Sequence, residues 1–402
     1  MMKYLQSVTL FLKKPFFSDR RTLLGLWLLL PVVAALIKIS KHNNFLIFRY
    51  VYWHTVEQLP LYIPYPDQYA DTNHYGPFFS LVIAPFALLP TWWGLLFWEV
   101  ALSLFLFYAV KSLPLPHRKH VFLYWFCAHE LLTALFMSQF NIAIAAIILM
   151  SYCCIEKEKE GWAAFFIMFG TFVKLYGIVG LAFFFFSKHK ARLVAWLLVW
   201  AAIMFVAPML LSSPGYVLEQ YSGWWESLAS KNADNLFATY QNISLLGMAR
   251  KISGSASYSD LWLIAGGLAL FGLPYLRVSQ YRNEAFRYAL LSSVLLFVVL
   301  FSTGSESSSY IIAFVGVSLW YVTAPWQRTR WDIALLVFVF VLTSMSPSDL
   351  FPACLRREWV QPYALKALPC VLVWIKLTYE MCVRDYSVNQ TTVAHVEKRE
   401  NS

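Results

Sequence analysis

The sequence predicts an all-helical protein that crosses a membrane about twelve times. Of its 402 residues, 59% are hydrophobic, 18% are aromatic and only 13% are charged, and the mean hydropathy is +0.56. Soluble domains carry about 25% charged residues, so this chain has about half of the charged surface that water would require. Apolar runs recur along the whole chain, which is typical of helices that have lipid as their solvent. The composition excludes a cytosolic enzyme with a membrane tail and a disordered scaffold.

The expected helices follow the apolar segments in order. Several are shorter than the ~20 residues that a full crossing requires, and we expect these to be tilted, half-buried or re-entrant. Treating the second segment as re-entrant gives twelve crossings with both termini in the cytoplasm. The segments lie at 22–38, 77–90, 92–110, 121–137, 140–155, 162–175, 176–187, 191–212, 261–277, 288–302, 307–325, 331–346 and 363–380.

The distribution of basic residues favours this topology. Loops rich in Lys and Arg remain in the cytoplasm, and the topology with 77–90 re-entrant places most of the 32 Lys and Arg there. The net charge of +10 does not indicate a nucleic-acid partner, because the charges come in twos and threes between apolar segments. The inner clusters are Lys13, Lys14, Arg20 and Arg21, then His117–His120, Lys157 and Lys159, Lys188–Arg192, Arg282 and Arg287, Arg328 and Arg330, and the tail.

Three parts follow from this topology: a cytoplasmic segment (1–21), a multi-span domain (22–380), and a cytoplasmic polar tail (381–402) that we expect to be disordered. Two long loops, 39–76 and 213–258, face outward together with short turns near 138–141, 174–177 and 303–308. The outer side therefore carries almost every polar residue capable of chemistry. The six cysteines show no metal-binding spacing, so we expect no zinc, no structural disulfide and no cofactor, with the use of a divalent metal left open.

The first outer loop holds the richest group of reactive side chains. Asp67 and Asp71 are four residues apart and His74 is three further on, so on a helix all three would share one face. A carboxylate at the outer surface has the chemistry of a general base for an acceptor hydroxyl. The alternative is a solvated loop in which these residues only make turns.

Two charged residues interrupt apolar stretches at the outer side. Lys174 lies in GTFVKLYG (170–177), where a lysine is costly, by ~2.5–3.5 kcal/mol at a helix centre, and is therefore a candidate for contact with a phosphate. Glu306 opens a segment rich in hydroxyls and would orient a sugar, bind a cation or cap its helix. The structural alternative for Lys174 is a side chain that extends to the membrane interface.

Four amides lie at two outer turns: Gln139 and Asn141 at the first, and Gln241 and Asn242 at the second. Amides at such positions would hydrogen-bond a sugar or would cap helices, and the sequence does not decide between these roles.

The order of these motifs resembles glycosyltransferase family 87 of the GT-C superfamily, and the subgroup found in Bacteroidota is the most similar. The similarity covers about residues 20–380. It is carried by NNFLIF (43–48), YGPFFSLVIAPFALLP (75–90), SQFN (138–141), FVKLYG (172–177), YQNISLLG (240–247) and SESSSYIIA (305–313).

The resemblance implies a GT-C-like fold in a bacterial inner membrane, with the active site facing the periplasm or exterior. It implies a transferase that moves a sugar, typically mannose, from a polyprenyl-phosphate donor to a lipid or glycan acceptor with inversion at the anomeric carbon. Nothing in the sequence demands more than a monomer. Besides the donor, the acceptor and membrane lipids, no partner is implied. His74, Tyr75, Gln139, Asn141, Lys174, Gln241, Asn242 and Glu306 would bind these substrates, and Arg250 and Lys251 are further phosphate contacts.

One departure from the family pattern bears on the catalytic base. GT-C enzymes commonly carry a catalytic Asp or Glu in the first outer loop. Many family 87 members have an Asp where this chain has Asn43 and Asn44. The expected base is therefore another carboxylate of that loop. Asp71 is the first choice, followed by Asp67 and Glu57. An inactive relative is the alternative.

Two other functional classes fit many spans. A secondary transporter or lipid-linked flippase would use intramembrane charges such as Glu99, Glu130 and Lys174. It should gather polar groups near the midplane in broken helices, whereas the predicted topology gathers them at one face. A non-catalytic subunit of a membrane assembly is the third class.

Overall fold

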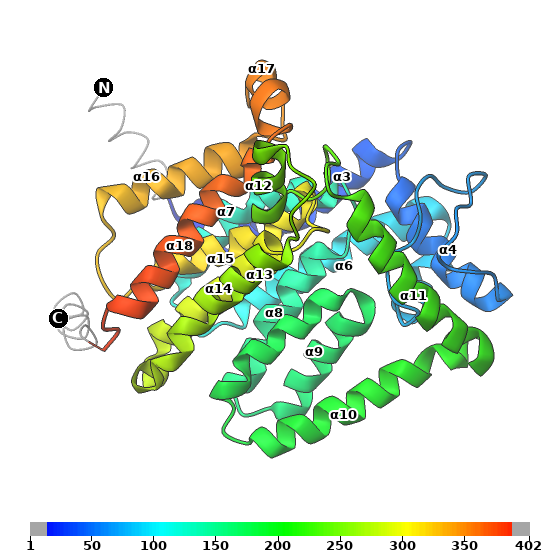
Figure 1. Cartoon of the computed structure of the whole chain (residues 1–402), viewed down its shortest axis with the longest axis horizontal. Coiled ribbons are helices and arrows are strands. Elements are labelled where there is room, and N and C mark those ends of the chain that lie inside the picture. The colour runs from blue at the N-terminus through cyan, green and yellow to red at the C-terminus, as the bar shows by residue number, and fades with distance from the viewer. Residues whose placement is uncertain (1–13, 388–402) are drawn as a thin grey trace. The chain divides into compact units, whose positions relative to one another are not determined.

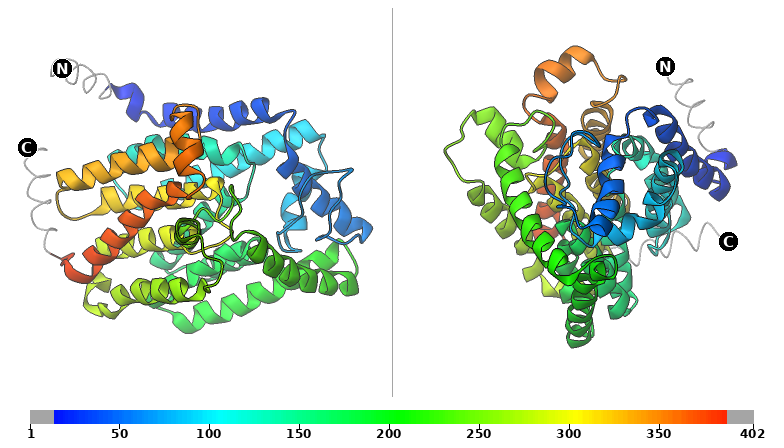
Figure 2. Two further views of the ribbon diagram at one scale, coloured as in Figure 1. Left: turned by 45° about the horizontal axis from the view of Figure 1, so that its top comes forward. Right: turned by 90° about the vertical axis from the view of Figure 1, so that its right-hand side faces the viewer.

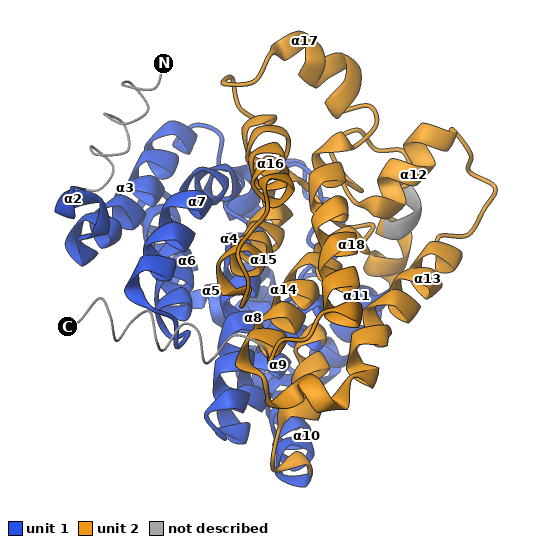
Figure 3. Ribbon diagram, turned by 90° about the vertical axis from the view of Figure 1, so that its left-hand side faces the viewer, with its two compact units in different colours: residues 1–178, 191–225 blue, residues 179–190, 226–402 orange. Residues whose placement is uncertain are grey.

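The structure is a computed structural model that describes residues 14–387, apart from the side chains of 232–234. Every regular element within these residues is a helix (Figure 1). The chain divides into two compact units, which Figure 3 distinguishes by colour. Unit 1 comprises Met1–Ile178 and Ala191–Trp225, and unit 2 comprises Val179–Lys190 and Glu226–Ser402. The predicted all-helical class is confirmed for the described part of the chain.

Unit 1 contains the N-terminal helices. The Asp19 side chain caps α3 by accepting the Arg21 N–H at 2.6 Å. In order, the helices are α2 (Pro15–Ser18), α3 (Arg20–Lys38), α4 (Asn43–Glu57), α5 (Phe79–Ala87), α6 (Thr91–Lys111), α7 (His117–Leu135), α8 (Asn141–Glu156), α9 (Glu160–Val173), the start of η1 (Leu175–Phe186), α10 (Lys190–Val206), η2 (Ala207–Leu210) and the first part of α11 (Pro214–Asp234).

Polar side chains join α3, α6 and α7 inside unit 1. The buried Trp27 of α3 donates its indole N–H to the Tyr124 carbonyl of α7 at 3.2 Å. Ser103 of α6 donates its hydroxyl to the Trp27 carbonyl at 2.6 Å. Phe107 and Tyr124 stack with centroids 4.4 Å apart. These contacts give each buried donor an acceptor, which apolar surroundings require.

Helix α8 is the central helix of unit 1 and contacts both α6 and α9. Residues 141–155 are buried except for Met150, and most of them are Ile, Ala and Leu. A helix that is apolar on all sides is stable only when other helices surround it. Because α8 begins at Asn141, its N-terminus carries one of the predicted site residues.

Unit 2 is built around α14, α15 and α18, which pack side by side (Figure 2, yellow-green to red). The Trp374 indole N–H donates to the Ser293 hydroxyl at 3.0 Å. The remaining elements are α12 (Leu245–Ser253), α13 (Leu261–Gly272), η3 (Leu273–Leu276), η4 (Val278–Arg282), α14 (Glu284–Leu300), η5 (Ser307–Ser309), α15 (Tyr310–Thr323), α16 (Arg330–Phe338), η6 (Val339–Met345), α17 (Ala353–Leu355), η7 (Arg356–Val360), η8 (Leu365–Ala367) and α18 (Leu368–Val383).

One buried carboxylate, that of Glu380, links α18 to the end of α15 and to the loop that follows it. Glu380 accepts the Trp320 indole N–H at 3.0 Å and pairs with Arg328 at 3.3 Å. Lys376 lies 3.0 Å from Asp332 and 3.7 Å from Glu380. Buried charges persist when they are paired in this way. These residues therefore have structural partners and are not candidates for the reaction.

Three described helices are long and apolar enough to cross a membrane: Arg20–Lys38, Thr91–Lys111 and Lys190–Leu210. Ala353–Val360 and Leu365–Val383 would add a fourth crossing as one span bent by 98°. Helix lengths therefore support a membrane protein, while the count of about twelve crossings and the three-part division of the chain stay predictions. The shorter apolar helices are Asn141–Glu156, Glu160–Val173, Leu175–Phe186, Leu261–Leu276 and Ser307–Thr323.

The predicted re-entrant segment, 77–90, contains one short helix, α5. Helix α5 has nine residues, about 14 Å of rise, which is less than half of a hydrocarbon core of about 30 Å. Within the predicted tail, α18 continues to Val383 and Tyr386 is buried against Phe286 and Trp326. Lys13 and residues 388–402 lie outside the described residues.

Candidate functional site

The start of α4 holds two neighbouring segments through amide side chains. Asn43 Nδ2 donates to the Ala70 carbonyl at 2.7 Å, and the Ala70 N–H donates back to Asn43 Oδ1 at 2.7 Å. Asn44 Nδ2 donates to the Met137 carbonyl at 2.8 Å. Both side chains therefore act as N–H donors, which an ionised carboxylate cannot do.

The two predicted carboxylates, Asp67 and Asp71, are both exposed. Asp71 follows the anchored Ala70, has φ of 75°, and accepts the Thr72 N–H at 2.8 Å. The left-handed conformation is uncommon outside glycine, although Asp tolerates it better than most residues. The loop is not helical, because prolines interrupt it, so Asp67, Asp71 and His74 do not share the helix face considered above.

Asp67 lies in a separate turn that is fastened to α4. His54 Nε2 lies 2.8 Å from Gln68 Oε1, and its ring is 4.1 Å from the Tyr65 ring. Burial lowers the pKa of His54, which the Gln68 hydrogen bond partly offsets, so the neutral ring is favoured at neutral pH. Glu57, the third candidate base, is exposed at the last residue of α4.

The segment after Asp71 is fixed by its own side chains and by α11. The Tyr75 N–H donates to Asn73 Oδ1 at 3.0 Å, and Asn73 Nδ2 donates to the Tyr75 carbonyl at 3.1 Å. His74 Nε2 lies 3.3 Å from the Thr72 hydroxyl, and the His74 carbonyl accepts the Trp224 indole N–H at 3.0 Å. The backbone at His74 and Tyr75 is thus held by Asn73 and Trp224.

Gly76 brings this segment against the end of α9. Its N–H donates to the Val173 carbonyl at 3.1 Å. A Cβ at this position would clash with the Phe172 carbonyl and lie 2.9 Å from Trp224 Cη2. Only glycine fits, because two backbone segments and an indole meet there.

Five residues form what we term the lysine cluster: Tyr75, Gln139, Asn141, Lys174 and Tyr176. Asn141 Nδ2 donates to Gln139 Oε1 at 2.8 Å, and Lys174 Nζ donates to Asn141 Oδ1 at 2.7 Å. The Lys174 ammonium lies 4.9 Å from the Tyr176 ring centre and 5.7 Å from the Tyr75 ring centre. Both distances are within the ~6 Å range of a cation–π contact. The cluster is a positive charge fixed between an amide and two rings.

Two turns present the lysine cluster. In the first, Ser138 has φ of 51° and donates its hydroxyl to Glu99 Oε1 at 2.8 Å, which gives that buried carboxylate a donor. In the second, Lys174 ends α9, and Gly170 and Gly177 lie so close together that a Cβ on either would overlap the other's backbone. The chain can therefore reverse directly after the lysine.

Unit 2 has its own group of predicted site residues around Asn242. This buried residue has φ of 51°, and its Oδ1 accepts the Ser244 hydroxyl at 2.7 Å. Its Nδ2 is buried with no hydrogen-bond partner among the described residues. A Cβ on Gly247 would clash with the Asn242 carbonyl. The Ile243 N–H donates to the Ser305 carbonyl at 2.8 Å, which joins this loop to the turn before α15.

Glu306 and a lysine that the sequence analysis did not single out lie at that turn. Glu306 forms a capping box with Ser309 at the start of η5. Lys366 is only 3% exposed, and its Nζ donates to the Ser307 carbonyl at 3.0 Å and to its hydroxyl at 2.9 Å. The Lys366 ammonium also lies 5.0 Å from the Tyr310 ring centre. Its place inside the last predicted apolar segment, 363–380, was the only signal in the sequence.

The two other basic residues predicted to contact the phosphate, Lys251 and Arg250, have different partners. Lys251 Nζ donates to the Gln241 carbonyl at 3.0 Å, and burial lowers the pKa of Lys251 to about 8. Arg250 is buried, pairs with Asp260 at 2.6 Å and stacks over Tyr258 at 4.3 Å. The Arg250 guanidinium is therefore held mainly by its own loop, and its contact with a phosphate stays a prediction.

The predicted residues thus fall into separate groups. Tyr75, Gln139, Asn141 and Lys174 are joined in unit 1, with His74 beside them in the chain. Gln241, Asn242 and Glu306 belong to unit 2 and are linked through Lys251, Ser305 and Ser309. Among the described residues, no three His, Cys, Asp or Glu side chains form a group that could hold a metal ion.

Comparison with known protein families identifies the family to which the chain belongs. The family model of glycosyltransferase family 87 matches residues 73–303, more than half of the chain. The chain belongs to glycosyltransferase family 87. A search of curated proteins finds no match.

Family 87 membership confirms the resemblance predicted above and makes the chain a membrane glycosyltransferase. The matched range includes the whole lysine cluster and Asn242. It begins after Asn43, Asp67 and Asp71 and ends before Glu306, so the assignment of those residues rests on this chain's own geometry.

Proposed function

We propose that this family 87 protein transfers a sugar, with mannose as the first candidate, from a polyprenyl-phosphate donor to a lipid or glycan acceptor. The reaction would take place on the extracytoplasmic face of a bacterial inner membrane. The observation that carries the proposal is the lysine cluster, which fixes a positive charge at an outer turn inside the family-matched range.

Lys174 has the chemistry needed to stabilise the departing phosphate. Its ammonium has three N–H donors, and Asn141 accepts one of them at 2.7 Å. A fixed donor stabilises charge that develops during the reaction more effectively than a mobile one, because it does not reorganise. Tyr75 and Tyr176 give the site flat apolar faces, which suit the apolar side of a sugar ring.

Asp71 is the proposed base. Its neighbours are anchored on both sides, since Ala70 is held by Asn43 and the segment from Asn73 is held by α9 and α11. The exposed carboxylate would accept the proton of the acceptor hydroxyl. The acceptor oxygen bonds to the anomeric carbon from the face opposite the phosphate. The bond between that carbon and the phosphate oxygen breaks, and its electron pair leaves with polyprenyl phosphate.

In unit 2, the polar groups proposed to orient donor and acceptor are Gln241, Asn242 and Glu306. The Asn242 amide is the best supported, because its buried Nδ2 has a hydrogen to donate and no partner among the described residues. A buried unpaired donor costs ~1–3 kcal/mol, which a substrate oxygen would recover on binding.

The test is transfer of radiolabelled mannose from polyprenyl-phosphate-mannose to a membrane lipid extract, using purified protein. Wild type should transfer the label, and Asp71→Asn should lower the rate by about 10²–10⁴, the range for loss of a general base. Asp67→Asn is the matched control, since it removes an exposed carboxylate of the same loop, and it should stay within about threefold of wild type.

Two outcomes would overturn parts of this proposal. Equal activity of Asp71→Asn and wild type would remove Asp71 as the base. Absence of transfer from mannose, glucose and arabinose donors by well-folded protein would overturn the donor assignment and favour the transporter or subunit alternatives.

A further inference from the structure

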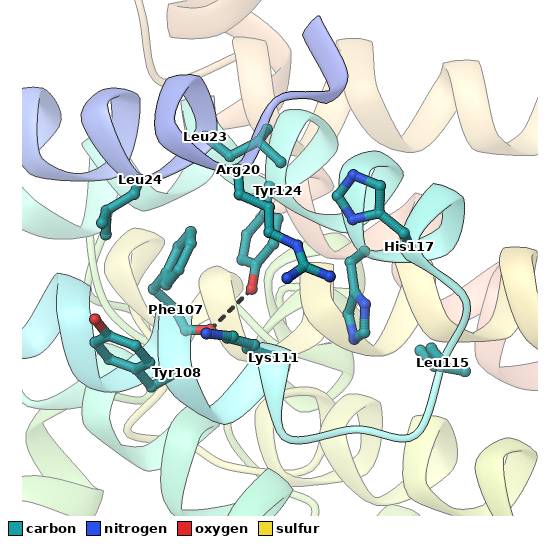
Figure 4. A pocket seen from close by; sticks show the side chains of 10 residues that line it. Arg20, Leu23, Leu24, Phe107, Tyr108, Lys111, Leu115, His117 and Tyr124 are labelled. Atoms are coloured by element: carbon teal, nitrogen blue, oxygen red, sulfur yellow. Dashed lines mark hydrogen bonds between the residues drawn. The ribbon is translucent and has the colours of Figure 1, made fainter. Parts of the chain in front are cut away.

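A cavity of about 270 Å³ opens in unit 1 between α3, α6 and the start of α7 (Figure 4). None of the residues that line it belongs to the lysine cluster, and the proposed reaction does not use it. The residues that line it are Arg20, Leu23, Leu24, Phe107, Tyr108, Lys111, Leu115, His117, His120 and Tyr124.

The cavity carries basic side chains from three elements and no acidic one among the described residues that line it. Arg20 comes from the first turn of α3, Lys111 from the last turn of α6, and His117 and His120 from the first turn of α7. None of the four forms an ion pair in the described part of the chain. Arg20 and Lys111 carry permanent positive charges, and the two histidines add N–H donors, so the arrangement favours an anion.

Hydrogen-bond capacity remains on both histidines and on Lys111. His117 Nε2 donates to the Ser18 carbonyl at 2.7 Å, which leaves its Nδ1 for another contact. His120 Nε2 is buried and has no hydrogen-bond partner among the described residues. The Lys111 ammonium lies 5.6 Å from the Tyr108 ring centre. Buried polar atoms without partners are uncommon and indicate a missing ligand or water.

The remaining wall of the cavity is apolar. Phe107 and Tyr124 stack 4.4 Å apart, and the Tyr124 hydroxyl is occupied by the Phe107 carbonyl at 3.0 Å. Leu24 continues into a row of exposed apolar residues on α3 that includes Leu28 and Leu36. A cationic rim above an apolar row suits a molecule with an anionic head and a hydrocarbon chain.

We propose that this cavity binds the phosphate group of an anionic phospholipid. Ligand cavities for drug-sized molecules span roughly 300–1,000 Å³, so 270 Å³ accommodates a head group with the start of a chain. The acyl chains would lie along the exposed row of α3. The predicted topology places the loops that carry Arg20, Lys111 and His117 on the cytoplasmic side, so the lipid would belong to the inner leaflet.

The full-length protein would be placed in phosphatidylcholine nanodiscs doped with phosphatidylglycerol, extracted in detergent, and examined for retained lipid by native mass spectrometry. The double variant R20Q/K111Q should retain about tenfold less phosphatidylglycerol than wild type, since it loses two charge-assisted contacts. R21Q/R118Q is the matched control. It removes two charges from the same loops without changing the cavity lining, and it should stay within about twofold of wild type.

A second variant tests the cavity without a change in charge. Leu24→Trp would fill it and should reduce retained phosphatidylglycerol as strongly as R20Q/K111Q. Equal losses in the two double variants, or unchanged retention in Leu24→Trp, would overturn the proposal in favour of general attraction to the membrane surface. Displacement of the lipid from wild type by excess inorganic phosphate would overturn the lipid assignment and identify a site for free phosphate. Retention of phosphatidylcholine should be the same in every variant.

Discussion

Replacement of Lys174 by glutamine is expected to lower kcat/KM for sugar transfer by about 10²–10³. The reason is the position of the ammonium, which Asn141 fixes at 2.7 Å and which lies 4.9 Å from the Tyr176 ring centre. A fixed donor aimed at developing charge is worth ~2.7–4 kcal/mol of transition-state stabilisation, and each 1.36 kcal/mol corresponds to about tenfold in rate.

The effect on folding should be smaller than the effect on rate. Lys174 is half-buried, and its hydrogen bond to the neutral amide oxygen of Asn141 is worth ~1.5–3 kcal/mol at most. The Gln amide can still donate to Asn141, so the free energy of unfolding should fall by only about 1 kcal/mol. Lys174→Arg keeps the charge but not the compact geometry, and its activity should lie between wild type and Lys174→Gln.

The assay is steady-state transfer from polyprenyl-phosphate-mannose at varied donor concentration, together with thermal unfolding in detergent. Lys38→Gln is the matched control, because Lys38 also lies over an aromatic ring, 5.8 Å from that of Phe136, outside the lysine cluster. A drop in kcat for Lys174→Gln with an unchanged control supports charge stabilisation of the leaving phosphate. Unchanged kcat with a lowered melting temperature would refute it and make Lys174 a structural residue.

Three further predictions follow from the contacts. Gly76→Ala should destabilise the protein by about 1–3 kcal/mol in thermal unfolding and lower transfer, whereas Gly25→Ala, with open space around its Cβ, should be neutral or stabilising. Asn43→Asp should lose the donor to Ala70 and lower activity at pH 7.5 by about tenfold, with partial recovery at pH 5 as the carboxyl is protonated; equal loss at both pH values would contradict this. Burial lowers the pKa of Lys251 to about 8 in the folded state, from 10.5 in the unfolded state. Below pH 8 both states bind the proton, so this group does not change the free energy of unfolding with pH; between pH 8 and 10.5 only the unfolded state binds it, and the free energy of unfolding should rise by about 1–2 kcal/mol. Lys251→Met should abolish this rise in melting scans.

The helices within apolar segments were predictable from the sequence. The predicted segment 92–110 corresponds to α6 at Thr91–Lys111, and 140–155 corresponds to α8 at Asn141–Glu156. Prolines and charges bound these runs, and within a run hydrocarbon surroundings leave the backbone no alternative to the helix. Hydropathy therefore fixes both the existence and the limits of such elements.

Helices in the outer loops could not be predicted in the same way. Helices α4 and α11 lie in segments expected only as long loops, and they mix aromatic and polar residues without a long apolar run. Their stability comes from tertiary contacts, such as the Tyr216 hydroxyl donating to the Leu59 carbonyl at 2.6 Å and the Leu61 N–H donating to Gln220 at 2.8 Å. Such long-range contacts have no local signature.

The candidate site was predictable as a set of residues but not as an arrangement. Lys174, Asn141 and Gln139 were each singled out by polarity in apolar surroundings, yet the hydrogen bond between positions 141 and 174 follows only from the packing of α8 against α9. Lys366 was missed because it lies near the start of the last predicted apolar segment, where a lysine is ordinary at a membrane interface. Burial to 3% exposure is what distinguishes it.

The hydrogen-bond partners of Asn43 and Asn44 explain why amides occupy these two positions. Each donates an N–H to a backbone carbonyl, so a carboxylate at either position would face an oxygen at hydrogen-bond distance unless it were protonated. The residue that Asn43 anchors is Ala70, and the next residue, Asp71, has a left-handed backbone and an exposed carboxylate. An acid at position 43 would still accept the Ala70 N–H but would lose the donor to the Ala70 carbonyl, which would weaken the anchor of the loop that carries Asp71. It follows that the two amides favour a catalytic Asp71 rather than an inactive relative, which is the outcome that Asn43→Asp and Asp71→Asn distinguish together.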